Sequence, residues 1–171
     1  MLLKREIGKE MLIVLKKKSM TKKSAGILLF RKVNSILEIF LVHPGGPFWQ
    51  KKDLGAWSIP KGEFADEEDV LIAAKREFLE ETGTSVTGEF IELTLVRQKS
   101  GKLIYAWAVQ GDIDSSTIKS NNFEMQWPPK SGLIKSFPEI DKGEWFSIDD
   151  AKHKINPSQI SFIDELIGKV K

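Results

Sequence analysis

The sequence predicts an α+β fold, in which one domain has a mixed β-sheet between α-helices. Two observations lead to this prediction: strand-like segments stand on both sides of an amphipathic helical segment, and further helical segments end the chain. The length of 171 residues suits one domain with a sizeable apolar core. Hydrophobic residues make up 41% of the chain and charged residues 29%, which is typical of a globular domain.

The first patterned region is rich in apolar residues that alternate as strands do. We expect these elements, in order: a strand at 25–32, a turn at 33–35, a strand at 36–43, a short strand at 57–60 and a turn at 61–65. The Pro-Gly-Gly-Pro run at 44–47 ends the second strand and begins a loop that contains Phe48 and Trp49.

A helix should begin at Asp66, which is a good N-cap residue and is followed by acids in the first turn. Its inward residues recur at helical spacing: Val70, Leu71, Ala74 and Phe78. Gly83 stands where a C-cap glycine belongs.

The second half predicts two strands, a long irregular stretch and a helical end. We expect strands at 90–98, 103–111 and 145–147, and helices at 148–154 and 157–170, the last with Pro157 in its first turn. Residues 112–142 lack clear periodicity, and a stretch of that length is usually a functional loop or a disordered one.

Charge divides the chain into a basic N-terminal extension, 1–22, and a domain, 23–171. Residues 1–19 carry six basic and two acidic side chains, so the rest of a chain with net charge +2 sums to −2. The apolar stretch 11–15 is too short for a signal peptide core or a membrane span. The extension is interpreted as a dispensable appendage, with Met20 as a possible functional start; the alternative is a basic helix that docks on a partner or membrane. The mildly acidic body gives no reason to expect a nucleic-acid surface.

Cysteine is absent, which excludes disulfides, thiolate metal sites and a cysteine nucleophile. This composition suits a reducing cytoplasm, and we expect a cytoplasmic location without a membrane anchor. The two histidines, His43 and His153, exclude a histidine-rich metal site. Any metal must be held mainly by oxygen atoms, which indicates a hard cation such as Mg²⁺ or Mn²⁺.

The segment from Gly62 to Thr84 carries the strongest signal for chemistry. Its fixed positions are Gly62, Glu68, Arg76, Glu77, Glu80, Glu81 and Gly83, at a spacing of Gly-x₅-Glu-x₇-Arg-Glu-x₂-Glu-Glu-x-Gly. With each residue type at roughly 5–7%, a chance match is on the order of one in 10⁸ per starting point.

Three glutamates in this segment form an acidic patch. Glu77, Glu80 and Glu81 are at positions i, i+3 and i+4, so they share one side of a helix. Like charges at this spacing repel by a few tenths of a kcal/mol, and a divalent cation reverses that sign. Arg76 supplies a permanently charged fork that can orient a neighbouring carboxylate. The alternative is a solvated acidic helix face.

The segment resembles the Nudix box, and the order of strands around it resembles a Nudix domain from about Ser24 to the C-terminus. The resemblance implies the Nudix fold and hydrolysis of a bridged di- or polyphosphate by water. It further implies that Glu77, Glu80 and Glu81 bind Mg²⁺ or Mn²⁺ and that one of them is a candidate base for the attacking water. Arg76 would hold Glu77, while Glu68 would act at the start of the helix or in the outer metal shell.

The position after Gly83 departs from the family pattern, because Thr84 replaces an aliphatic residue there. That position packs the helix end, so stability is affected more than chemistry. Val86 can fill the gap.

Four residues outside the box are candidates for the site. Nudix enzymes often recruit another acid from a later loop, and Glu124 is the best candidate as metal ligand or base, with Glu139 as the weaker alternative. Residues 57–62, Trp-Ser-Ile-Pro-Lys-Gly, resemble the lead-in of dinucleoside polyphosphate hydrolases, which makes Lys61 a substrate contact. Tyr105, the only tyrosine, stands where related enzymes place a base-stacking ring. The alternatives are an exposed glutamate for Glu124 and a core aromatic for Tyr105.

Residues 127–132, Trp-Pro-Pro-Lys-Ser-Gly, resemble a segment of a little-characterised group of small Nudix proteins. Two prolines stiffen this loop and present Lys130 with little entropy left to lose. We interpret 112–142 as a substrate-facing lid that carries Glu124 and Lys130; the alternative is a rigid surface turn. If the lid interpretation fails, specificity determinants should be sought in 44–52.

These features predict an enzyme that acts on dinucleoside polyphosphates or nucleoside triphosphates. Alternatives are the clearance of oxidised nucleotides, trimming of RNA 5′ ends, and a binding module that has lost catalysis. The complete set of acids argues against the binding module. Neither the base of the substrate nor the oligomeric state follows from the sequence.

Overall fold

The computed structural model describes residues 21–170, and residues 1–20 of the proposed extension 1–22 lie outside them. The elements, in chain order, are β1 (Lys23–Val33), β2 (Ile36–Pro44), β3 (Lys61–Glu63), α2 (Val70–Thr82), β4 (Ile91–Arg97), β5 (Leu103–Gln110), the 3₁₀ turn η1 (Ser115–Thr117), β6 (Asn122–Gln126), β7 (Ile134–Pro138), β8 (Ile140–Ser147), α3 (Ile148–Lys154), the 3₁₀ turn η2 (Pro157–Gln159) and α4 (Ile160–Lys169). No helix among these is long and apolar enough to cross a membrane.

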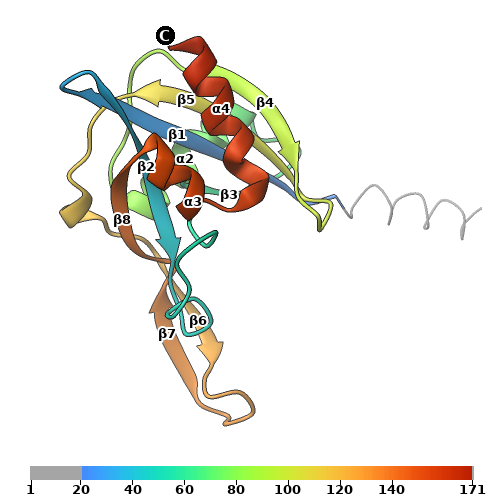
Figure 1. Ribbon diagram of the computed structural model, residues 1–171. Helices are drawn as coiled ribbons and strands as arrows, with labels where there is room; N and C mark the ends of the chain where they lie inside the picture. The colour runs from blue at the N-terminus through green and yellow to red at the C-terminus, as the bar shows by residue number, and fades with distance from the viewer. Residues whose placement is uncertain (1–20, 171) are drawn as a thin grey trace, which may run out of the picture.

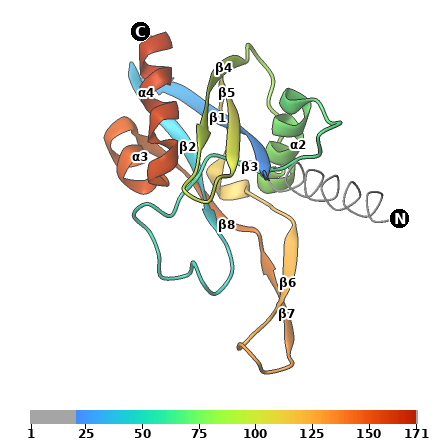
Figure 2. The same ribbon diagram turned by 90° about the vertical axis from the view of Figure 1, so that its right-hand side faces the viewer.

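One mixed sheet forms the centre of the domain, in the order β4-β5-β1-β2-β8, with β3 paired to β1. The β1–β5 pair is parallel and the other pairs are antiparallel. Figure 2 shows α3 and α4 on one face of this sheet and α2 on the other. The predicted α+β sandwich is therefore confirmed.

The central strands are apolar on both sides because helices cover both faces. In β1, Leu28 and Phe30 belong to the core under α3 and α4. Ile27 and Leu29 point the other way, into the core that includes Phe78 of α2. This second core holds α2 against the sheet and so fixes the position of the box.

The start of α2 differs from the expectation. The N-cap is Asp69, whose Oδ1 accepts the Ile72 N–H at 3.0 Å, and the first turn holds no acids. Asp66 instead pairs with Lys23 at 2.9 Å, so the segment before Asp69 runs as a turn. At the other end, Gly83 has a φ of 76° and caps the helix as predicted.

A short strand was expected at 57–60 and a turn at 61–65. The strand instead lies within the expected turn, as β3. Gly26 explains the shift, because a Cβ there would lie 2.6 Å from the Pro60 oxygen and 2.7 Å from the Lys61 Cβ. This close approach lets β3 pair with β1. Trp57, just before this strand, is buried in the core.

The region 112–142 contains more order than its sequence suggested. Within it β6 and β7 form a two-stranded hairpin that projects away from the main sheet (Figure 1). The last predicted strand also begins earlier, at Ile140. The final helix begins with the 3₁₀ turn η2, because Asn156 caps that turn and Pro157 starts it.

Candidate active site

The three box glutamates lie along α2 on the side that meets β3. Glu77 is buried, whereas Glu80 and Glu81 are half-buried. Phe78, between them, is buried in the core, so packing of the apolar face fixes how the carboxylates project.

Arg76 connects three carboxylates into one network. Its Nε and Nη2 donate to the two oxygens of Glu68 at 2.7 and 3.0 Å. Its Nη1 donates to Glu77 Oε1 at 2.6 Å and to Glu80 Oε1 and Oε2 at 3.2 and 3.3 Å. The bond from Arg76 lowers the pKa of Glu68, and the same network raises the pKa of Arg76. Arg76 is therefore placed to orient Glu77 and Glu80, and Glu68 holds the Arg76 side chain in position.

Gly62 permits the close approach of the Glu77 carboxylate to the β3 backbone. A Cβ at position 62 would lie 1.8 Å from Glu77 Oε2, so the Glu77 carboxylate would have to move. Burial raises the pKa of Glu77, although Arg76 opposes this. This close contact explains why the motif has a glycine at position 62.

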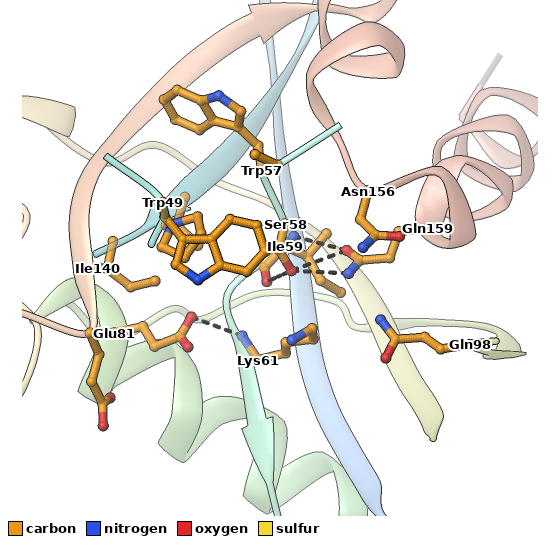
Figure 3. A pocket seen from close by; sticks show the side chains of 14 residues that line it. Trp49, Trp57, Ser58, Ile59, Lys61, Glu81, Gln98, Ile140, Asn156 and Gln159 are labelled. Carbon is orange, nitrogen blue, oxygen red and sulfur yellow. Dashed lines mark hydrogen bonds between the residues drawn. The ribbon is translucent and has the colours of Figure 1, made fainter. Parts of the chain in front are cut away.

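Glu81 faces β3 and Lys61 (Figure 3). Its Oε2 accepts the backbone N–H of Lys61 at 3.0 Å. Burial raises the pKa of Glu81 to about 8, against the opposing charge of Lys61. Burial also lowers the pKa of Lys61, while the nearby carboxylates oppose this. The site thus keeps an acid and an amine in a desolvated setting.

A fourth acid comes from the segment between β7 and β8. Burial and the charge of Glu80 raise the pKa of Glu139, and Glu139 in turn contributes to the raised pKa of Glu77 and Glu81. Glu139 therefore stands close enough to the box acids to join them at one site.

Lys61, Glu81 and Glu139 share the wall of one cavity with a volume of about 290 Å³. The other lining residues are Val42, Pro44, Trp49, Ala56, Trp57, Ser58, Ile59, Gln98, Ile140, Asn156 and Gln159. Figure 3 shows Glu81 and Ile140 on one side of this cavity, and Gln98, Asn156 and Gln159 on the other. The cavity therefore has acidic side chains at one end, Glu81 and Glu139, and amide side chains at the other, Gln98, Asn156 and Gln159.

A family model described as the NUDIX domain matches residues 20–166. The chain belongs to the NUDIX family. The fixed positions noted in the sequence are therefore those of a Nudix box, and the family is one of hydrolases that act on pyrophosphate-type bonds.

Solved structures confirm the Nudix fold at low sequence identity. A Caenorhabditis elegans Ap4A hydrolase binary complex gives a TM-score of 0.61 at 18% identity, covering 86% of this chain and 97% of that chain. The NUDIX domain of Shewanella oneidensis NrtR, complexed with ADP ribose, gives 0.62 at 16% identity, covering 88% and 89%. A MutT protein from Methanosarcina mazei gives 0.57 at 16% identity, covering 88% and 96%. No match was found among curated protein sequences.

The box acids of this Nudix chain suit a divalent metal by their chemistry. Within residues 21–170, no three acidic, histidine or cysteine side chains already surround a common point. Instead, Glu77 and Glu80 bond Arg76, and Glu81 bonds the β3 backbone. Carboxylate oxygens are the ligands that Mg²⁺ and Mn²⁺ prefer.

Two predicted lid residues of the Nudix domain do not join this site. Glu124 lies in β6 opposite Ser136, is exposed, and is absent from the cavity wall. Lys130 lies in the exposed turn between β6 and β7, at the far end of the hairpin from the main sheet. Alternation along the hairpin and its outward direction place both side chains away from the cavity wall. The fourth acid is Glu139, which the sequence ranked second.

Tyr105 also lies elsewhere in the Nudix fold. It is on β5, with its ring 5.9 Å from that of Phe64, and it does not line the cavity. The base-stacking position expected for it is therefore not supported. Lys61, in contrast, lines the cavity as expected.

Several cavity residues were missed in the sequence. Gln98, Asn156 and Gln159 come from segments without any motif, and the fold alone brings them together. Trp49 had a signal, since an exposed aromatic in a Pro-Gly-rich loop is unusual for a purely structural residue. Val86 does pack against the core at the end of α2, where Thr84 departs from the family pattern.

Proposed function

We propose that this Nudix chain uses Mg²⁺ or Mn²⁺ to hydrolyse a phosphoanhydride bond in a nucleoside diphosphate that is linked to another group. The preferred substrates are dinucleoside polyphosphates or nucleoside triphosphates. The observation that carries the proposal is the Arg76-ordered set of carboxylates at the acidic end of a cavity that also holds Lys61.

Each residue of the site has a proposed task. Glu77, Glu80 and Glu81 hold the cation. When bound, the cation neutralises charge on the phosphate oxygens and lowers the pKa of water. Glu139 completes the acidic cluster as a further ligand or accepts the proton of the attacking water at its carboxylate. The Lys61 ammonium pairs with a phosphate oxygen, because the desolvated ammonium gains a charged hydrogen-bond partner there.

The size of the cavity supports a nucleotide substrate. Its volume of about 290 Å³ lies near the lower end of typical ligand pockets, which run from roughly 300 to 1,000 Å³. One nucleoside fits such a space, and the other half of a dinucleoside polyphosphate would extend outside it. The neighbouring structures, one of an Ap4A hydrolase and one of a domain complexed with ADP ribose, agree with this proposal.

An assay that separates the nucleotide products and pyrophosphate by ion-exchange chromatography, run over a nucleotide panel, tests the proposal. The panel contains dinucleoside polyphosphates, ordinary and oxidised nucleoside triphosphates, a nucleoside diphosphate sugar and 5′-triphosphorylated RNA, each with Mg²⁺ and with excess EDTA. We expect turnover of at least one small nucleotide, with Mg²⁺ only. Full turnover in EDTA would contradict the metal requirement, and no turnover of any member would contradict the activity.

Other outcomes of the same panel identify the alternatives. A preference for oxidised triphosphates would indicate a nucleotide-clearing enzyme, and a preference for RNA would indicate 5′-end trimming, which the mildly acidic body disfavours. Binding without turnover would indicate a silent Nudix module. A cytoplasmic location, expected from the absence of cysteine, stays a prediction.

A further inference from the structure

Trp49 lies in the loop between β2 and β3 and lines the cavity. Figure 3 shows its indole ring over the cavity, between the side of Glu81 and the side of Gln98. The residue remains 38% exposed, and the Lys52 ammonium lies 4.8 Å from its ring centroid. A cation occupies one face of a ring, so the other face is available to a flat partner.

The second half of the Trp49 loop is fixed to the body of the protein. His43 Nε2 lies 2.7 Å from the Lys52 carbonyl oxygen. The Asp53 carboxylate accepts the Trp57 indole N–H at 2.8 Å and pairs with Lys154 at 2.5 Å. These contacts attach the loop to β2, to the core and to α3.

The first half of the same loop rests on the hairpin. The Gly45 N–H donates to the Glu139 carbonyl oxygen at 2.8 Å, and a Cβ on Gly46 would lie 2.8 Å from the Phe123 ring. Further out, the Phe48 and Trp127 rings meet edge to face with centroids 5.4 Å apart. Since Phe48 precedes Trp49 directly, the hairpin restricts where the Trp49 ring can stand.

We propose that Trp49 is the stacking platform for the nucleobase of the substrate and that the β6–β7 hairpin positions it through the contact between Phe48 and Trp127. This inference rests on the proposed nucleotide hydrolase function and assigns the residue that recognises the base. Trp49 touches the substrate, whereas Trp127 acts through Phe48 as a positioning residue.

The chemistry around Trp49 fits a base better than a sugar or a peptide. Asn156 Oδ1 already accepts two bonds from Ser158, at 3.0 and 2.8 Å, so its amide leaves N–H donors for an acceptor on a ring edge. Within residues 21–170, the Gln98 side chain makes no hydrogen bond and can donate or accept. A flat ring with hydrogen-bonding edges satisfies both the platform and the amides.

Replacing the Trp49 ring tests the stacking. In Trp49→Leu, we expect KM for the best nucleotide found in the panel to rise about 5- to 150-fold, the range that corresponds to loss of one base stack. Trp49→Phe keeps an aromatic face and should retain most of the affinity. The inhibition constant of inorganic tripolyphosphate, which has no base, should stay unchanged in both variants. Leu54→Ala, at an exposed position of the same loop, is the matched control and should match the wild type.

Replacing Trp127 tests the positioning. Trp127→Ala should raise KM for the nucleotide several-fold, by less than Trp49→Leu does, and leave kcat and the tripolyphosphate inhibition constant unchanged. Trp127→Phe should restore the wild-type KM, because an edge-to-face contact with Phe48 can form again. Combined with Trp49→Leu, Trp127→Ala should add nothing, since it acts only through the Trp49 ring.

The outcomes separate this inference from the proposed function. Nucleotide turnover with an unchanged KM in Trp49→Leu would overturn the stacking platform and leave the hydrolase intact. Equal losses for nucleotide and tripolyphosphate would also overturn it, because the loop would then act on phosphate binding. If the wild type hydrolyses no nucleotide, the proposed hydrolase function is wrong. Calorimetric titration of ATP into the Mg²⁺-loaded wild type and Trp49→Leu then tests the stacking platform by binding affinity alone.

Discussion

The two walls of the cavity are built in different ways. The wall from α2 is held by charged groups close together in the chain, with Arg76 reaching Glu77 and Glu80 on the same helix. The wall that carries Trp49 is held by aromatic and backbone contacts between distant segments, such as Phe48 and Trp127, which are 79 positions apart. The comparison teaches that the wall from α2 is encoded mainly by local sequence, whereas the wall that carries Trp49 depends on the tertiary structure.

The largest effect should come from the charged wall, at Glu81. Glu81→Gln removes a ligand while keeping the shape and one acceptor for the Lys61 N–H. We expect kcat to fall by at least about 10²-fold, the range of a lost acid–base or electrostatic group. Circular dichroism and melting temperature should match the wild type, as should the kcat of the control Glu144→Gln on β8. Wild-type turnover in Glu81→Gln would remove α2 from the chemistry.

A steric change should break the same wall without touching a charge. In Gly62→Ala, the added Cβ must displace the Glu77 carboxylate, which it would otherwise approach to 1.8 Å. A displacement on the order of 1 Å can cost about 10²-fold in rate. Steady-state kinetics should show a loss of kcat by about 10- to 100-fold. Gly168→Ala, at an open position in α4, is the control for a glycine change. An active Gly62→Ala enzyme would show that Glu77 can move freely.

The fourth acid can be assigned by a matched pair. Glu139→Gln should lower kcat by about 10-fold or more, because Glu139 interacts with the box acids, whereas Glu124→Gln should leave kcat unchanged. Both changes remove one charge from the same region, so they control for each other. The reverse result would restore Glu124 to the site and would mean that the hairpin bends inward during turnover.

A smaller effect concerns pH and metal together. Burial raises the pKa of Glu81 to about 8 from 4.5, so without metal the folded protein holds this proton more tightly than the unfolded chain. The associated stability is present below about pH 4.5 and is lost as the pH rises through about 8. A cation binds the ionised carboxylate, so saturating Mg²⁺ should raise the melting temperature more at pH 8.5 than at pH 6. Equal gains at both pH values, or no difference from Glu81→Gln, would contradict this assignment.

The sequence could predict the charged wall because its residues are local. The spacing of Glu77, Glu80 and Glu81 on a helix follows from helical periodicity, and the structure confirms the helix and its cap at Gly83. The start of the helix was placed three residues too early, since Asp66 and Asp69 are both good caps and only the pairing of Asp66 with Lys23 decides between them.

The sequence could not predict the Trp49 wall, because no local pattern places a hairpin beside a loop. The aromatic contacts of the Trp49 loop involve Phe123 and Trp127, which lie far from it in the chain. The same reason explains why Lys130 does not line the cavity: the direction of the hairpin is a property of the whole fold. Residues 44–52 were the alternative place to seek specificity determinants if the lid interpretation failed, and this segment contains Trp49.

One double-variant cycle tests most directly whether the two walls act independently. The quantity measured is kcat/KM for the best nucleotide in the wild type, in Glu81→Gln, in Trp49→Leu and in the double variant. Independent walls predict that the factors of the two single variants multiply to within about twofold, because one change affects the chemical step and the other affects base recognition. A departure of about tenfold from the product would show that Glu81 and Trp49 work as one unit and would contradict the independence of the two walls.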